Sequence, residues 1–234
     1  MSNPDTNCPF RYTEYGSGPL SKPEGDPRCL VAEATHKVKF RKGQVLFVQG
    51  EPSTSLYSLS SGVVKICSTL ADGREQIIGL SHPGNLLVGL QSIAEEKYAY
   101  SAIAATPVRA CRINHERLLE MVRERGDVAM SLIRVLNAQL THSRALMEVM
   151  GHKSAGAKIA SLILLMVPEH QHDNTEFNLP FSRGEIANLL NLSEETVCRQ
   201  MAEMKRSGII SAPRRFVAVL DWDRLRAMAD GVAN

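Results

Sequence analysis

The sequence predicts an α+β fold: an N-terminal β jelly roll or barrel, then a long helix, then a C-terminal winged helix-turn-helix. Three observations lead to this prediction. Short apolar segments separated by turn residues fill residues 38–113, as is typical of antiparallel barrels and jelly rolls. Apolar residues then recur at spacings of three and four over residues 127–150. Residues 181–220 show two short helical patterns followed by two strand patterns.

The composition suits a globular protein of two modest domains, because the 234 residues are 44% hydrophobic and 22% charged. The net charge of +2 is too small to indicate a nucleic-acid partner, so any basic surface must be local. The longest apolar run, Ile159–Val167, is too short to cross a bilayer, and no secretory leader begins the chain. Five cysteines, an odd number, argue against a disulfide framework. We therefore expect a cytoplasmic protein with no membrane partner.

The first 37 residues are rich in proline and glycine, which predicts a loop-like arm. Strand-like segments with turn residues between them follow the arm. The predicted strands are Val45–Val48, Leu56–Leu59, Val63–Cys67, Gln76–Leu80, Ala99–Ala105 and Val108–Ile113.

Two helices are predicted after the strands. Asn114 is a candidate cap for the first, over residues 115–125. The second carries a seam at heptad spacing over nearly three repeats, which favours a parallel dimer; the alternative is a helix packed on its own barrel. The seam residues are Ile133, Leu136, Leu140, Ser143, Met147 and Met150. Gly151 and Gly156 then mark a hinge before an apolar helix, Ala157–Val167.

A helix-turn-helix is predicted between residues 181 and 206. Ser182, with Glu185 three residues later, forms a capping box that begins the first helix, and Ser193 caps the second. The inward residues of the second helix are Val197, Met201 and Met204, and its outward residues are Glu194, Glu195, Cys198, Arg199 and Lys205. A helix-turn-helix places such outward residues against base edges in the major groove, although many two-helix patterns never touch DNA.

A wing follows these two helices. Ile209-Ile210 and Phe216–Leu220 are predicted strands, with Pro213-Arg214-Arg215 at the turn between them. The two arginines are therefore placed where a phosphate backbone can lie.

The order of barrel, long helix, hinge and winged helix-turn-helix resembles the CRP/FNR family of bacterial transcription regulators over residues 38–230. The motifs that carry the resemblance are Arg41-Lys42-Gly43-Gln44-Val45-Leu46-Phe47, Ser61-Gly62-Val63-Val64-Lys65, Asp72-Gly73-Arg74-Glu75-Gln76-Ile77, Pro83-Gly84, Ser182-Arg183-Gly184-Glu185-Ile186-Ala187 and Glu195-Thr196-Val197-x-Arg199. After the arm of residues 1–37, which the resemblance does not cover, the resemblance implies a cyclic-nucleotide-binding-like sensor barrel over 38–126, a dimerisation helix over 127–152 and a DNA-binding domain over 153–234.

The resemblance also implies that Glu195 and Arg199 read a guanine and its paired cytosine. The chemistry agrees, because a carboxylate accepts from cytosine N4 and a guanidinium donates two hydrogen bonds to guanine O6 and N7. Glu194 stands where the CRP branch has a further arginine, so the CRP-type first guanine contact is lost. The FNR branch has serine in place of Cys198, which puts the outermost thymine contact in question. We therefore expect FNR-like palindromic half-sites of the TTGAT type.

The remaining expected DNA contacts are polar or basic residues around the two helices and the wing. Phosphate contacts position a protein without specifying sequence. Ser182, Arg183, Arg214 and Arg215 are expected to hold phosphates, and Ser193 and Thr196 complete the predicted DNA-binding set.

The cAMP-binding members have a Gly-Glu-Leu turn and, about ten residues on, an Arg-Ser or Arg-Thr pair that binds the cyclic phosphate. This chain has Gly84-Asn85-Leu86 and then Tyr100-Ser101. Because a phosphate needs a fixed cation, the missing arginine argues against cAMP binding.

Oxygen-sensing members hold an iron–sulfur cluster through three close N-terminal cysteines and a later one that matches Cys111. Here only Cys8 and Cys29 lie in the arm, and Cys67 is the remaining candidate for a fourth thiolate. Four thiolates suit a cluster, but this spacing is not a recognised one, and ordinary buried or loop thiols are the alternative. Haem is the other candidate cofactor, with Cys8-Pro9 or the histidines His36, His82 and His115 as ligands.

Cys198 has a second interpretation. A thiol near the positive end of a helix ionises more readily, and its oxidation would put polar bulk against DNA. The alternative is a small residue that simply fits the groove.

These patterns predict a homodimeric DNA-binding transcription regulator that responds to a redox, gas or small-molecule signal through its barrel. RNA polymerase is a partner expected from the resemblance. FNR proteins carry an acidic residue in the dimer helix that keeps their cluster-free form apart, whereas the matching stretch here, Leu140 to Met147, has none. The resemblance therefore implies a dimer that persists without an effector. The alternative is an effector-binding module with a cluster or haem whose main output is not DNA binding. Paired carboxylates, a nucleophile–base set and a Gly-rich phosphate loop are all missing, which argues against an enzyme.

Overall fold

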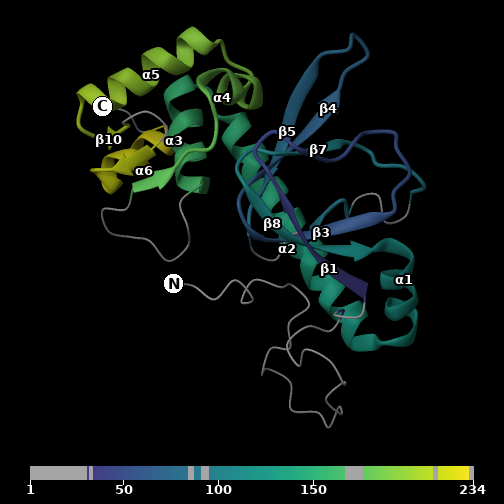
Figure 1. Ribbon diagram of the computed structural model, residues 1–234. Helices are drawn as coiled ribbons and strands as arrows, with labels where there is room; N and C mark the ends of the chain where they lie inside the picture. The colour runs from purple at the N-terminus through teal and green to yellow at the C-terminus, as the bar shows by residue number, and fades with distance from the viewer. Residues whose placement is uncertain are drawn as a thin grey trace, which may run out of the picture. The chain divides into compact units, whose positions relative to one another are not determined.

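The computed structural model describes residues 31, 34–83, 87–90, 95–166, 176–212 and 216–231, in two compact units that meet between Thr141 and His142. The first unit contains β1 (Thr35–Phe40), β2 (Val45–Phe47), β3 (Ser55–Ser61), β4 (Val64–Thr69), β5 (Glu75–Ser81), β6 (Leu87–Val88), β7 (Ser101–Ala104), β8 (Val108–Asn114) and α1 (His115–Glu124) (Figure 1). The long helix α2 (Gly126–Gly151) begins in the first unit and ends in the second. The second unit continues with α3 (Ala155–Met166), β9 (Glu176–Asn178), α4 (Arg183–Leu190), α5 (Glu194–Arg206), β10 (Ile210–Ser211), β11 (Phe216–Val219) and α6 (Trp222–Ala229).

The strands of the first unit form two antiparallel sheets, in the orders β1-β8-β3-β6 and β2-β7-β4-β5. The predicted fold class is confirmed, with a β-rich domain, a long helix and a C-terminal helix-turn-helix. Within the described residues no strand pairing joins the two sheets into a closed barrel, so the jelly-roll alternative describes them better. One hydrophobic cluster draws residues from both sheets, which shows that the sheets bury their facing sides against each other.

Aromatic side chains pack between the two sheets. The rings of Phe47 and Tyr98 stack with their centroids 3.9 Å apart, and Tyr57 and Tyr100 lie within 6.0 Å of the Phe47 ring. The Tyr98 hydroxyl accepts a hydrogen bond from the Ser55 N–H at 3.0 Å and donates one to the Ser55 carbonyl at 2.8 Å. The polar end of the buried Tyr98 ring thus has partners, as buried tyrosines require.

The other two tyrosine hydroxyls also bond to the backbone of a different strand or turn. Tyr57 donates to the Leu46 carbonyl at 3.3 Å, and Tyr100 accepts from the Gly89 N–H at 3.1 Å. Burial raises the pKa of Tyr100 to about 12, so this hydroxyl stays protonated at all physiological pH values. The interior is therefore held by hydrogen bonds as well as by apolar contact.

A second core lies on the outer side of the β1-β8-β3-β6 sheet, where α1 and the first half of α2 pack. Leu56 and Ile113 supply the sheet side, and Leu118, Val128 and Leu132 supply the helical side. Asn114 caps α1 by accepting from the Arg117 N–H, as the sequence predicted. This core fixes the start of α2 on the sheet.

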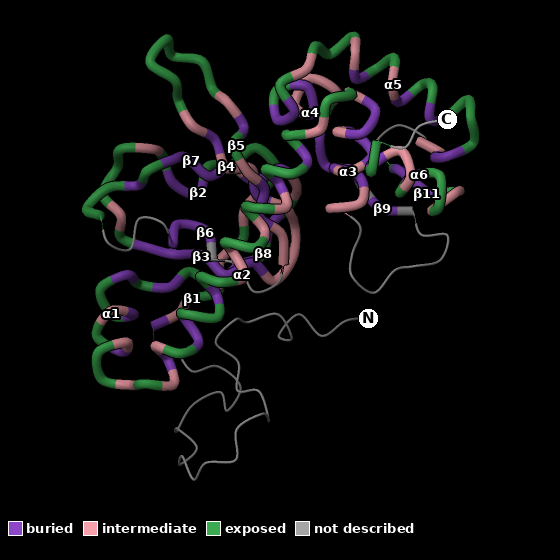
Figure 2. The backbone as a smooth tube through the Cα atoms, turned by 180° about the vertical axis from the view of Figure 1, so that it is seen from behind, coloured by how far each residue is buried: buried purple, intermediate pink, exposed green. Residues whose placement is uncertain are grey.

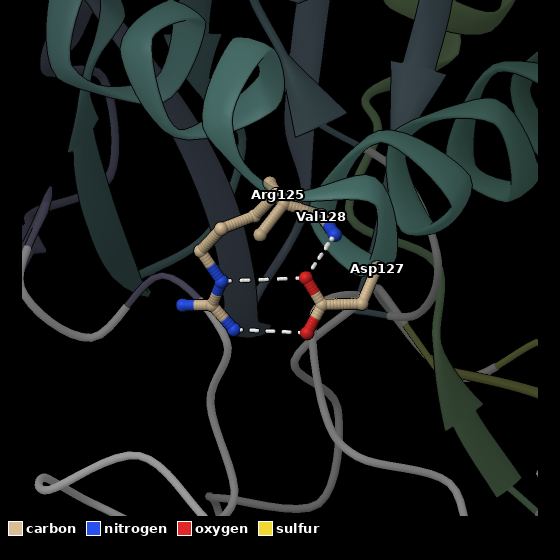
Figure 3. A network of polar contacts seen from close by, with 3 residues as sticks. All are labelled: Arg125, Asp127 and Val128. Carbon is tan, nitrogen blue, oxygen red and sulfur yellow. Dashed lines mark hydrogen bonds and ion pairs between the residues drawn. The ribbon is translucent and has the colours of Figure 1, made fainter. Parts of the chain in front are cut away.

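The junction between α1 and α2 is held by an ion pair (Figure 3). Arg125 Nη2 lies 2.9 Å from Asp127 Oδ2, and Arg125 Nε donates to Asp127 Oδ1 at 3.3 Å. The same Oδ1 accepts from the Val128 N–H at 2.9 Å, which satisfies one donor of the first turn of α2. Burial raises the pKa of Asp127, but its hydrogen bond with Arg125, the charge of that arginine and the Val128 N–H outweigh burial and leave the pKa below its usual value.

This lowered pKa predicts an acid-sensitive contribution to stability. Because the pKa is lower in the folded than in the unfolded chain, the contribution is present above about pH 4 and is lost as the pH falls through the folded-state value. We expect Asp127→Asn to lower the free energy of unfolding by up to about 1 kcal/mol at pH 7, and the difference from wild type to shrink as the pH falls below about 4. Urea titrations across this pH range measure it.

Asp72→Asn is the matched control for this experiment. Asp72 also pairs with an arginine, Arg74, but at an exposed hairpin tip where solvent screens the pair. It is expected to change stability little at any pH. A difference between wild type and Asp127→Asn that stays constant from pH 7 to pH 3 would contradict the role given to Asp127.

In the second unit, α3 packs against α5 and α6, and α4 packs against α5. The wing sheet has the order β10-β11-β9, so the predicted strand pair has a third strand, which the sequence did not reveal. The sequence also did not reveal α6, which Asp221 caps by accepting from the Arg224 N–H. In the described part of the chain, no helix combines the length and hydrophobicity that a membrane span needs.

Candidate nucleic-acid interface

The two helices α4 and α5 begin at the caps that the sequence predicted. Ser182 Oγ accepts from the Glu185 N–H at 3.2 Å, and Glu185 Oε2 accepts from the Ser182 N–H at 2.8 Å, which completes the capping box. Ser193 Oγ accepts from the Thr196 N–H at 3.1 Å and caps α5. Both helix starts are thus fixed by local hydrogen bonds.

The turn between α4 and α5 depends on Asn191. This residue adopts the left-handed conformation, with φ 52° and ψ 53°, which asparagine tolerates better than most residues. The N–H of the next residue, Leu192, bonds back to the Ala187 carbonyl at 2.9 Å. The chain therefore leaves α4 sharply and enters α5 two residues later.

One face of α5 is buried and the other is exposed (Figure 2). Val197, Met201 and Met204 are at most 3% exposed, because they pack into the core of the unit. The opposite face presents exposed residues that include Glu194, Glu195, Cys198, Arg199 and Lys205. This division matches the predicted inward and outward residues of the second helix.

Glu195 and Arg199 lie one turn apart on the exposed face of α5. In the part of the chain that the structure describes, neither side chain takes part in a hydrogen bond or an ion pair. A carboxylate and a guanidinium on one exposed helix face, each with its hydrogen-bonding groups unused, form a suitable pair for reading a C·G base pair.

Arg183 lies against α5 instead of projecting freely. Its Nη1 donates to the Met201 sulfur, and the side chain is half-buried. Burial lowers the pKa of Arg183, while the nearby Cys198, when ionised, opposes this shift. A thioether is a weak acceptor, so most of the guanidinium donors remain available for an anion such as a phosphate.

The two hydroxyls at the start of α5 are engaged with each other. Ser193 Oγ and Thr196 Oγ1 lie 2.8 Å apart, in addition to the capping bond. The hydrogen bonds of the helix cap therefore fix the orientation of the Ser193 and Thr196 hydroxyl groups, which are the groups predicted to contact DNA.

The tip of the wing lies outside the described residues, and Arg214 and Arg215 are there. The strand after it begins with Phe216, which is 49% exposed and pairs with Asn178 of β9. The wing therefore presents an aromatic ring next to the position of the two arginines in the sequence.

Lys158 of α3 contributes a contact that the sequence did not reveal. Its Nζ donates to the Leu190 carbonyl at 3.3 Å, where α4 ends. A cation there complements the negative end of the helix and satisfies an orphan carbonyl. A single lysine in an otherwise apolar helix indicates that its ammonium group has a specific partner. The sequence did not indicate that this partner is a carbonyl at the end of α4.

The predicted seam of α2 is exposed along its whole length. The apolar members show exposed fractions of 55% for Ile133, 48% for Leu136, 49% for Leu140, 68% for Met147 and 37% for Met150. Ser143 is also exposed. Met130, which is 50% exposed and three residues before Ile133, extends the stripe by one further position. The residues of α2 that do pack in the first unit lie on a different face, so the seam is not used for packing on the chain's own sheets.

The described cysteines do not come together. Cys67 is buried on β4, where it pairs with Ile77 and Ser101, and Cys111 is half-buried on β8 in the other sheet. Cys8 and Cys29 lie outside the described residues. Among the residues described, no group of three or more histidine, cysteine, aspartate or glutamate side chains could hold a metal ion. The described side chains alone therefore do not fit a cluster.

The other sensor residues are distributed over the first unit. Tyr100 packs inside the jelly roll, and the Ser101 hydroxyl accepts from the Gln49 N–H at 2.9 Å. The glycine of the cAMP-type turn, Gly84, lies outside the described residues. His115 is buried with Nδ1 2.8 Å from the Ser53 carbonyl, so this ring nitrogen is engaged in a backbone contact.

Comparison with known proteins gives two family matches. Residues 37–125 match the cyclic nucleotide-binding domain, and residues 157–228 match the Crp-like helix-turn-helix domain. The boundary between the two matches falls within the long helix and the hinge.

The chain is also similar to proteins along most of its length. A probable transcriptional activator from Rhizobium leguminosarum bv. viciae is 34% identical over 227 residues, which cover 95% of this chain and 92% of the relative. The transcriptional activator protein Anr of Pseudomonas aeruginosa is 33% identical over 194 residues, covering 82% of this chain and 79% of that protein. Among solved structures, FixK2 from Bradyrhizobium japonicum matches with a TM-score of 0.74 and 25% identity, covering 83% of this chain and 96% of FixK2.

Proposed function

This chain belongs to the CRP/FNR family of transcription regulators, on its FNR side, and from that premise we propose that it binds a palindromic operator as a homodimer and activates transcription there. The relatives are named as activators, and they are regulators and not enzymes. The observation that carries the proposal is the exposed face of α5, where Glu195 and Arg199 make no hydrogen bond or ion pair with any other described residue.

In this proposal α2 joins two copies of the chain. The exposed seam from Ile133 to Met150 is an apolar stripe that a second copy would cover, at the heptad spacing of a parallel coiled coil. The two copies of α5 would then enter successive major grooves about 34–36 Å apart. A two-fold protein of this kind requires a palindromic operator, and the half-sites proposed for it are of the TTGAT type.

Fluorescence anisotropy with a palindromic TTGAT duplex tests the proposal. We expect the protein to bind this duplex at least about 10³-fold more tightly than a scrambled duplex at physiological salt. The logarithm of the binding constant should fall linearly with the logarithm of the salt concentration, because phosphate contacts release counterions. Equal affinities for the two duplexes would contradict the proposal.

The signal is the second part of the proposal. The first unit is proposed to sense a redox, gas or small-molecule signal, and α2 to carry it to α5. The ultraviolet–visible spectrum of protein purified without oxygen distinguishes an iron–sulfur cluster, a haem and a cofactor-free form. RNA polymerase is the proposed partner at the promoter, and a pull-down in the presence and absence of operator DNA tests that contact.

Cys198 gives a prediction about redox sensitivity of the DNA-binding face. It is exposed on α5 between Glu195 and Arg199, so an oxidised sulfur there would lie against the DNA. Attack of the thiolate on hydrogen peroxide gives a sulfenic acid and hydroxide, which thiols reverse. We expect peroxide to abolish operator binding and dithiothreitol to restore it.

Cys198→Ser is the control for this effect. It keeps a small polar side chain at the same position but cannot be oxidised to a sulfenic acid. Operator binding by the serine variant should not respond to peroxide. An equal loss of binding in the variant would assign the effect to another cysteine.

A further inference from the structure

A buried hydroxyl inside the jelly roll holds the backbone of a short segment, residues 88–90. Tyr100 is only 5% exposed, and its hydroxyl accepts a hydrogen bond from the Gly89 N–H at 3.1 Å. The ring of Tyr100 packs near that of Phe47, with the centroids 5.7 Å apart. Because this interior excludes water, a Gly89 N–H that lost the hydroxyl would lose a partner that solvent does not replace.

The backbone of Gly89 also lies close against the sheet. Its φ is +93°, and a Cβ atom added there would lie 3.2 Å from the Ser55 carbonyl oxygen and 3.5 Å from Cε1 of Phe47. A residue with a side chain rarely adopts such a φ, and here the side chain would also find its space occupied. Gly89 is therefore confined between the sheet on one side and the Tyr100 hydroxyl on the other.

The two neighbours of Gly89 belong to different cores. Val88, which is 2% exposed, belongs to the cluster between the two sheets. Leu90, which is 1% exposed, belongs to the cluster that α1 and the first half of α2 form on the outer side of the sheet. The α2 members of that cluster include Leu132 and Val135. Three consecutive residues thus connect the interior of the jelly roll with the long helix.

The seating of α2 on the sheet determines where its seam points. Leu132 and Val135 face the core, whereas the residues that follow each of them, Ile133 and Leu136, are 55% and 48% exposed on the seam. A rotation of α2 about its axis would therefore turn the seam by the same angle. Because two copies are proposed to meet at this seam, such a rotation would change the spacing of the two α5 helices on the operator.

We propose that Tyr100 is a positioning residue for operator binding, whose hydroxyl fixes Gly89 and thereby, through Leu90, the seating of α2 on the sheet. The inference rests on the proposed DNA-binding function. The phenol group of Tyr100 is then a built-in occupant of a site that accepts a small aromatic molecule with a hydroxyl. Its removal loosens α2 and leaves that site open to phenol itself.

Hydrogen exchange and operator affinity of the full-length Tyr100→Phe variant test the role of the hydroxyl. Amide exchange in residues 88–90 and 128–135 should become faster by about tenfold, because a buried donor loses its partner. Operator affinity should fall by about fivefold, a usual size for coupling between two sites.

Tyr57→Phe is the matched control. It removes a hydroxyl from the same interior, but that hydroxyl donates to the Leu46 carbonyl on β2 at 3.3 Å and not to residues 88–90. Exchange in the two segments and operator affinity should stay at the wild-type values. Equal effects of Tyr57→Phe and Tyr100→Phe would mean that each hydroxyl only supports the fold, and would overturn the positioning role.

Chemical rescue tests the site. Tyr100→Ala removes a group of the size of phenol, and apolar cavities of that size bind small aromatic molecules. Operator affinity should fall by about tenfold or more and return to within about threefold of wild type in millimolar phenol. Benzene, which fills the space without a hydroxyl, should restore less, and wild type should respond to neither compound. Circular dichroism checks that the alanine variant is folded, and Tyr100→Phe carries the test if it is not.

The possible results separate this inference from the function on which it rests. A wild type that prefers the operator to a scrambled duplex, combined with unchanged affinity in the folded Tyr100 variants, overturns the role of Tyr100 alone. Equal rescue by benzene and phenol overturns the role of the hydroxyl. A wild type that does not distinguish the two duplexes overturns the proposed function and its link to Tyr100, whereas hydrogen exchange still decides whether Tyr100 holds α2.

Discussion

Arg199→Ala is expected to lower the affinity for the specific operator by one to two orders of magnitude while changing the affinity for scrambled DNA only a few-fold. Arg199 is exposed on α5, and in the described part of the chain its guanidinium has no partner that would hold it away from DNA. A bidentate contact to guanine is worth about 1–3 kcal/mol of discrimination, which corresponds to this range. Glu195→Ala is expected to act at the paired cytosine to a similar extent.

The measurement is a double-mutant cycle that combines the Arg199→Ala substitution in the protein with a change of the G·C base pair in the operator. The affinities of wild type and Arg199→Ala are compared on the G·C operator and on an operator with A·T at the same position. The preference for G·C should disappear in the variant. Lys205→Ala is the matched control, because Lys205 is an exposed cation further along the same helix. It should change the affinity for all duplexes alike and leave the preference for G·C intact. A base preference that survives Arg199→Ala would exclude Arg199 as the reader.

Leu140→Glu is expected to convert the protein from a dimer to a monomer and to reduce operator binding by at least about a hundredfold. Leu140 lies at the centre of the exposed seam. In a parallel dimer it would face its own copy, so the substitution places two carboxylates in a desolvated interface. The loss of DNA binding follows because a dimer that is bound at one half-site holds its second DNA-binding domain at high effective concentration near the other half-site. A monomer loses this advantage.

Thr141→Glu is the control for this prediction. Thr141 is the next residue and is also exposed, but it is one step off the seam, so the same charge is added to the same helix without entering the interface. Sedimentation velocity should show a dimer for the wild type without any effector and for Thr141→Glu, and a monomer for Leu140→Glu. A wild-type monomer at micromolar concentration, or a Leu140→Glu dimer, would contradict the role of the seam.

The features that could be predicted from the sequence are those set by neighbouring residues. The caps at Ser182, Ser193 and Asn114 form because each hydroxyl or amide oxygen accepts from an N–H three residues further along the chain. The seam of α2 and the two faces of α5 follow from the helical period alone. The outward residues of α5 could therefore be predicted without knowledge of any tertiary contact.

The features that could not be predicted depend on residues far apart in the chain. The strands β6 and β9 have two and three residues, too few to show a period, and they exist because partner strands are in place. Lys158 meets Leu190 only because α3 packs beside the helix-turn-helix, whereas Arg183 lies on Met201 because α4 packs against α5. The Glu194 carboxylate approaches Gly184 across the turn, so that a Cβ added at Gly184 would lie 3.1 Å from Oε2, and neither helix has a sequence pattern that indicates this approach.

The double hydrogen bond between Tyr98 and Ser55 has a consequence for where β3 can begin. Strand β6 pairs with β3 at Tyr57 and Ser58, and within the described residues no strand pairs with Ser55 on that side. Ser55 is only 1% exposed, and the Tyr98 hydroxyl fills both the donor and the acceptor position beside its backbone, as a neighbouring strand would. A buried backbone group without a partner costs free energy comparable to a lost hydrogen bond. Tyr98 thus allows β3 to start inside the core of the jelly roll without leaving the polar groups of its first residue unsatisfied.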